Sequence, residues 1–100
     1  MQQGLLNVWI DHECRRISRF CERLDDKLCS GVCLEDAWES ILHFLQRRME
    51  KCLIPLVHAE LQRFLETSFD LRSRADFMIW RLNFEEALTN LLRFHRTAVL

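Results

Sequence analysis

Apolar residues recur at steps of three and four from the start of the chain, which is the spacing of one face of an α-helix. Between about Leu5 and Cys29 this pattern continues without interruption. Its central positions are Ile10, Cys14, Ile17, Cys21, Leu24 and Leu28. The regularity predicts one long amphipathic helix. Gly31 follows, and a glycine there can take the left-handed conformation that commonly ends a helix.

A second periodic segment begins near Leu34, runs to about Leu53 and meets Pro55 without a turn signal. Proline has no amide hydrogen to donate to the carbonyl of Lys51, and its ring crowds that turn. We therefore expect a kink or a short break at Pro55, with residues 56–66 continuing the second helix.

A third periodic segment is predicted from about Arg74 to Thr97. Ser73 precedes it, and Ser73 with Asp76 resembles a capping box in which Asp replaces Glu, while Asp70 is the other candidate cap. Its apolar positions are Phe77, Trp80, Phe84, Ala87, Leu91, Phe94 and Ala98. The sequence thus predicts a single all-α domain over residues 1–100, with three helices, the second kinked at Pro55.

Composition strengthens the helical prediction and suggests self-association. Hydrophobic residues make up 49% of the chain, whereas two glycines and one proline are too few for the tight turns of a sheet. Three helices with broad apolar faces have more apolar surface than a monomeric three-helix bundle can bury. We therefore expect a homodimer that forms a larger bundle. The alternative is a monomer in which the kinked helix wraps around the other two. The residues expected at the dimer interface are Ile10, Ile17, Leu24, Phe77, Trp80, Phe84 and Leu91.

The sequence shows no targeting or membrane signal. No basic stretch precedes an apolar core at the amino terminus, and no apolar run approaches the roughly 18 to 20 residues of a membrane span. We expect a cytoplasmic or nuclear protein without membrane association. Five cysteines, an odd number without an export signal, favour reduced thiols over a disulfide framework.

Basic residues gather on one face of the first predicted helix, although the net charge of the chain is -1. The members of this α1 stripe are His12, Arg16, Arg19, Arg23 and Lys27. They lie opposite the apolar face and cover about 22 Å at about 1.5 Å per residue. A shorter stripe on the second helix contains His43, Arg47 and Lys51.

Two such stripes side by side are suited to the phosphates of a duplex, recognised by shape and backbone instead of base edges. The residues expected to bind nucleic acid are Arg16, Arg19, Arg23, Lys27, Arg47 and Lys51. The alternative is a solvated helix face with intrahelical ion pairs. A dimeric bundle with basic stripes looks in outline like small viral double-stranded-RNA binders that suppress silencing, a likeness of architecture without a shared motif.

Motifs of catalysis are missing from the sequence. We find no nucleophile elbow, phosphate-binding glycine loop or His-Glu-x-x-His helix. Cys29 and Cys33 lack the paired spacing typical of zinc ligands. We expect no metal, cofactor or small-molecule substrate. The sequence therefore predicts a non-enzymatic, self-associating helical module that binds or regulates other proteins, with a dimeric binder of double-stranded RNA as the alternative.

Overall fold

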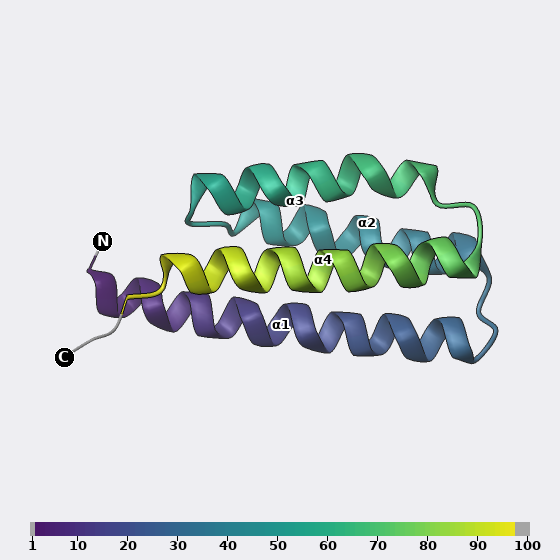
Figure 1. The fold of residues 1–100 in the computed structure, drawn as a ribbon, viewed down its shortest axis with the longest axis horizontal. Coiled ribbons are helices and arrows are strands. Elements are labelled where there is room, and N and C mark those ends of the chain that lie inside the picture. Colours follow the sequence, from purple (N-terminus) through teal and green to yellow (C-terminus); the bar gives the residue numbers. More distant parts are fainter. Residues whose placement is uncertain (1, 98–100) are drawn as a thin grey trace.

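The computed structural model describes residues 2–97 as four α-helices joined by short connections. They are α1 (Gln3–Cys29), α2 (Leu34–Glu50), α3 (Pro55–Thr67) and α4 (Arg74–His95), with a 3₁₀ turn, η1 (Ser68–Asp70), between α3 and α4. Consecutive helices run in opposite directions and form an elongated bundle of 46 × 22 × 18 Å (Figure 1). The all-α prediction is confirmed for this part of the chain. Ala98, expected on the last helix, lies outside the described residues.

The prediction of three helices with a kinked second helix is wrong. The second helix ends at Glu50, and the chain then turns back so that α3 packs against α2 instead of continuing it. Pro55 is the first residue of α3. The N–H groups of a helix's first turn have no acceptor within the helix, so proline costs no hydrogen bond there. Ile54 before it is extended, at φ -119° and ψ 115°, as steric contact with the proline ring favours. Its side chain is buried and anchors the turn to the core.

The other helix ends follow the expected signals. Gly31 has φ 84°, in the left-handed region, and ends the turn after α1. Ser73 caps α4, since its Oγ accepts from the amide of Asp76 at 3.1 Å. The carboxylate of Asp76 accepts from the amide of Arg72 at 2.9 Å, one residue earlier than in a standard capping box.

The residues expected at a dimer interface occupy the core of this one chain. Six of the seven are at most 5% exposed, and Leu91 is partly buried. The members of the fully buried group are Ile10, Ile17, Leu24, Phe77, Trp80 and Phe84. The extra helix supplies the apolar surface that a three-helix chain would lack. A surface for self-association must therefore be sought among exposed side chains.

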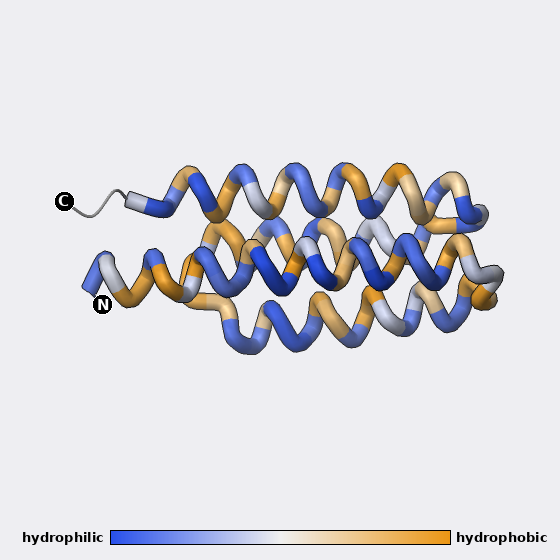
Figure 2. Tube along the Cα trace, turned by 90° about the horizontal axis from the view of Figure 1, so that it is seen from below, coloured by the Kyte–Doolittle hydropathy of each residue, from blue (hydrophilic) through white to orange (hydrophobic). Residues whose placement is uncertain are grey.

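The helices differ in length, and this gives the bundle a step at one end. The helices α1 and α4 have 27 and 22 residues, against 17 for α2 and 13 for α3. At about 1.5 Å per residue, α1 is about 40 Å long and α3 about 20 Å. The far ends are tied together, because Arg74 Nη1 donates to the carbonyl of Leu28 at 2.8 Å. The excess length of α1 consequently extends past the α2–α3 turn (Figures 1 and 2).

Candidate functional site

The two basic stripes lie side by side across the interface of α1 and α2. Three contacts fix how these helices are aligned: Glu13 with Arg48 (2.6 Å), the stacked rings of Phe20 and Phe44 (4.1 Å between centroids) and Lys27 with Ser40 (2.6 Å). Because the helices are antiparallel, Arg16 lies level with Arg47. His12 is similarly level with Lys51. Sequence analysis found both stripes, and the fold brings them together on one face.

A groove of about 660 Å³ separates the stripes along part of their length. Basic side chains border it from both helices, above the stacked Phe20 and Phe44, and these are Arg23, Lys27, His43 and Arg47. Two acidic side chains, Asp36 and Glu39, also border it. They belong to the first turns of α2, so acidic charge is confined to the end near the α1–α2 turn.

Most of the stripe is free of ion pairs. Arg16 donates to Glu13 at 2.7 Å, and Lys27 is held by Ser40. The remaining cations of the predicted nucleic-acid site are exposed and form no ion pair with any residue in 2–97, and these are Arg19, Arg23, Arg47 and Lys51. Their charges are available to an external anion at little cost in lost internal contacts.

Beneath the stripes, Glu13 and Arg48 form an ion pair inside the bundle. Glu13 is 3% exposed and Arg48 6% exposed, and the Arg48 guanidinium also lies 6.0 Å from the centre of the Phe44 ring. Sequence analysis missed this pair. A signal was present, since Glu13 falls between Ile10 and Ile17 at the same three-four spacing as the core residues.

Exposed hydrophobic side chains gather at the step in the bundle. Of the eight large hydrophobic residues exposed in the described chain, five belong to this end, with exposed fractions of 45–81%. They are Leu5, Val8, Leu53, Leu56 and Phe94. Partly buried Leu6 and Trp9 follow Leu5 and Val8 in the sequence, and partly buried Leu91 precedes Phe94 by about one turn. We call these eight residues the apolar ledge.

Helix alignment explains why the ledge is uncovered. Trp9 is one turn before Glu13, which already contacts the end of α2 through Arg48. On the other side Phe64 of α3 packs on Phe84 of α4. Since α3 begins nine residues before Phe64 and runs antiparallel to α4, Phe94 lies beyond the first residue of α3. Figure 2 shows hydrophobic segments at the start of α1 and at the α2–α3 turn at this same end.

Charge is divided unevenly between the two ends of the bundle. The half that holds the ledge, residues 2–17, 46–61 and 87–97, contains seven Arg or Lys and four Asp or Glu. The other half, residues 18–45 and 62–86, contains seven Arg or Lys and eleven Asp or Glu. The ledge half therefore has a net charge of +3 and the other half -4. The first ten residues, which supply half of the ledge, contain no charged side chain.

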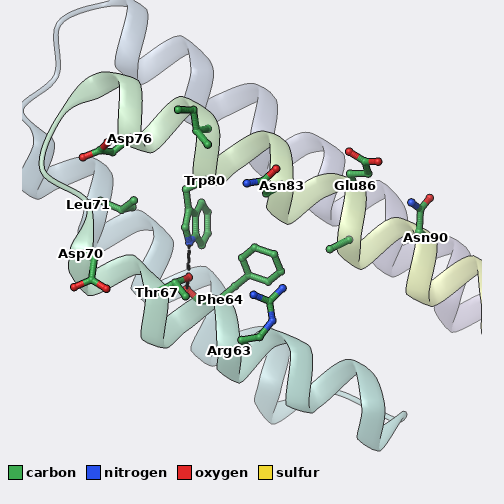
Figure 3. A pocket seen from close by; sticks show the side chains of 12 residues that line it. Arg63, Phe64, Thr67, Asp70, Leu71, Asp76, Trp80, Asn83, Glu86 and Asn90 are labelled. Carbon is green, nitrogen blue, oxygen red and sulfur yellow. Dashed lines mark hydrogen bonds between the residues drawn. The ribbon is translucent and has the colours of Figure 1, made fainter.

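A second groove, of about 700 Å³, runs between α3 and α4 (Figure 3). Trp80 closes its floor and is only 5% exposed. The indole Nε1 donates to the carbonyl of Phe64 and is within 3.2 Å of Thr67 Oγ1. Asn83, Glu86 and Asn90 make its rim polar. The aromatic floor is thus engaged inside the chain and offers little surface to a ligand.

The thiols give no indication of a reactive site. All five cysteines are free, and burial raises the pKa of Cys21 to about 12. Burial also raises the pKa of Cys14 and of Cys52. Cys29 and Cys33 are exposed, yet no group of three or more potential metal ligands occurs within residues 2–97. A thiol that stays protonated at neutral pH is a poor nucleophile and a poor metal ligand.

No family model, no curated protein and no solved structure matches the chain. Within the described residues, no helix is both long enough and apolar enough to cross a membrane.

Proposed function

We propose that this protein is a non-enzymatic helical interaction module that self-associates through the apolar ledge as a symmetric homodimer. The observation that supports this proposal is the concentration of exposed hydrophobic side chains at the step, led by Phe94 at 81% and Leu56 at 61% exposure. Contiguous apolar surface on a protein is typical of binding sites, whereas scattered apolar residues need no explanation.

The shape of the step favours a second copy as the occupant. In a two-fold dimer the same patch is used on both subunits. Two identical steps have identical depth, so the projecting ends of α1 and α4 of one copy fit the recess of the other. The tips of α1 and α4 then meet the α2–α3 turn of the second copy, where Leu53 and Leu56 are exposed.

Electrostatics gives this dimer a characteristic dependence on salt. Each ledge half carries a net charge of +3, so two ledges repel one another at low ionic strength. Salt shortens the Debye length to about 10 Å at about 0.1 M and weakens this repulsion. Association through the ledge is therefore expected to tighten as salt rises.

The test is the molar mass of the protein measured by light scattering and sedimentation from micromolar to millimolar concentration. In the test variant, Leu56→Gln and Phe94→Gln remove two ledge side chains while keeping helix propensity. Ile79→Gln and Leu82→Gln form the control, since these residues are 60% and 55% exposed on α4 away from the ledge. Full burial of such side chains contributes about 1.5 to 3 kcal/mol each, and the symmetric dimer loses four of them, so even partial burial should weaken dimerisation by at least about 100-fold.

The control variant should dimerise like the unmodified protein. A protein that remains monomeric at millimolar concentration in high salt contradicts the proposal. A dimer that is lost in the control variant and kept in the test variant moves the interface to the exposed face of α4.

A further inference from the structure

The α1–α2 face presents cations in two antiparallel rows. Along α1 the basic residues follow at every third or fourth position, which corresponds to about 5 to 6 Å. Packed helices lie about 8 to 10 Å apart, so the α2 row runs beside the α1 row at a similar scale. Four of these cations have no ion-pair partner within the described chain, and none of the four belongs to the apolar ledge.

We infer that this face binds the sugar-phosphate backbone of double-stranded RNA. The α1 row, Arg16, Arg19, Arg23 and Lys27, faces the phosphates of one strand. Arg47 and Lys51 face those of the other. Arginine suits this role because its planar guanidinium bonds phosphate oxygens in pairs. The inference stands apart from self-association, since it uses other residues.

The geometry favours a duplex over a single strand. Proteins that bind single strands stack the bases on exposed aromatic rings. Here Phe20 and Phe44 stack on one another with ring planes 2° apart, and Phe20 is buried. The rings beneath the rows are therefore engaged with each other and leave little aromatic surface for a base.

The form of the duplex follows from the shape of the face. The cation rows are carried by two packed antiparallel helices, and a face of this kind is broad and shallow. The minor groove of A-form RNA is wide and shallow and displays phosphates and 2′-hydroxyls. Base reading in B-form DNA requires an element that enters the major groove.

Acidic neighbours limit the number of phosphates contacted. Asp36 and Glu39 border the groove near the α1–α2 turn, and Glu50 lies beside Lys51 in a separate hollow at the end of α2. The central cations, Arg19, Arg23 and Arg47, are the ones best placed to bind. If about four phosphates are neutralised, the logarithm of the binding constant should fall with the logarithm of salt concentration with a slope of about -3 to -4.

The experiment is fluorescence anisotropy with a random-sequence RNA duplex of about 16 to 20 base pairs, the length that a comparable double-stranded-RNA module spans. A DNA duplex and a single-stranded RNA of the same length serve as comparison probes, and salt is varied from about 50 to about 200 mM. The test variant is Arg19→Gln, Arg23→Gln and Arg47→Gln. The control variant is Arg63→Gln, Arg72→Gln and Arg93→Gln, which changes the net charge equally at exposed positions elsewhere.

We expect micromolar or tighter binding of the RNA duplex at low salt. The test variant should bind at least 100-fold more weakly and lower the salt slope by about 3, while the control changes affinity by less than about threefold. The inference is overturned if the RNA duplex does not bind, if the test variant binds as the control does, or if single-stranded RNA binds as tightly. Equal affinity for the DNA duplex overturns the assignment to RNA. The Leu56→Gln, Phe94→Gln variant should bind the duplex at the same rows, which separates this result from the oligomeric state.

Discussion

Arg48 reaches from α2 to Glu13 of α1, with 2.6 Å between Nη1 and Oε1, and both side chains are almost completely buried. Arg16 approaches the same Oε1 atom at 2.7 Å from the solvent side. The carboxylate is thus shared by one buried and one exposed guanidinium. This arrangement fixes how α1 and α2 are aligned, and it thereby sets the two basic stripes level with each other.

Removing Glu13 should be more damaging than removing Arg48. Glu13→Leu leaves the Arg48 guanidinium buried without a carboxylate, and losses of about 3 to 5 kcal/mol are typical of such breaks. Arg48→Met should cost less, since Arg16 still pairs with the carboxylate. The double variant should recover a large part of the summed loss, because an apolar pair of similar volume replaces an ion pair. Urea unfolding of all four proteins measures the coupling, and additive losses would show that the two residues act independently.

The two glycines should respond to alanine in opposite directions. Neither has an atom within 4 Å of an added Cβ, so space does not distinguish them. Gly31 has φ 84°, and an L-residue there costs about 1 to 2 kcal/mol. Gly4 lies in the first turn of α1, where Gly31's constraint is absent and alanine should stabilise by up to about 0.5 kcal/mol. Thermal unfolding of the two variants should shift the melting temperature down for Gly31→Ala and slightly up for Gly4→Ala.

Thiol reactivity should divide the cysteines by burial. At pH 8 an aromatic disulfide reagent should modify the exposed Cys29 and Cys33 first. Cys21 should react only as fast as the bundle opens, because it has no exposed surface and its pKa is raised to about 12. Mass spectrometry of peptides after timed labelling identifies the order. Fast labelling of Cys21 in native buffer would contradict the buried position.

The same thiol gives stability an alkaline limit. The unfolded Cys21 loses its proton near its ordinary pKa of 9.0, whereas the folded one holds it to about 12. The unfolded state therefore binds fewer protons in this window, and stability falls as pH rises from about 9 to about 12. In Cys21→Ala this part of the decline should disappear. Urea midpoints at pH 8, 9 and 10, compared between the two proteins, measure it.

At the acid end, Asp11 makes a smaller contribution of opposite sign. The hydrogen bonds from Arg96 hold the pKa of Asp11 below its ordinary value of 3.8. Stability from this pair is complete above the unfolded pKa and is lost as pH falls through the lower folded value. Since both side chains are exposed, the effect should be small. Arg96→Gln should lower the urea midpoint slightly at pH 7 and leave it unchanged near pH 2.

The prediction from sequence worked where a residue type permits one local structure. The glycine after the first helical segment correctly predicted the end of α1. The serine three residues before an aspartate correctly predicted the cap of α4. Pro55 permits two structures, a kink within a helix or the first position of a new one. Only the packing of α3 back against α2, with Ile54 in the core, decides between them.

The candidate surfaces were predictable to different degrees. The α1 stripe depends on helical geometry alone, so spacing was enough to find it. The apolar ledge depends on where α2 and α3 stop, because Leu6 and Trp9 follow the same three-four spacing as residues that the bundle covers, whereas Leu5 and Val8 belong to the outer row that continues into His12 and Arg16. The Glu13–Arg48 pair needs both helices in register. A charged residue at a core position indicates a buried partner without identifying it.

The hydrogen bonds at the step also join the start of α1 to the residues that end α4 and follow it. The amide of Thr97 donates to Asn7 Oδ1 at 3.1 Å, and Gln3 reaches the carbonyl of His95. Residues 2 and 97 therefore lie at the same end of the bundle, and the path of the described chain is almost closed. A circular permutant with a short linker from 97 to 2, opened between Ser30 and Gly31, would keep every helix intact. Its linker would lie at the end of the bundle that holds the ledge, away from the central cations Arg19, Arg23 and Arg47, so the two surfaces could be studied one at a time in a single folded scaffold.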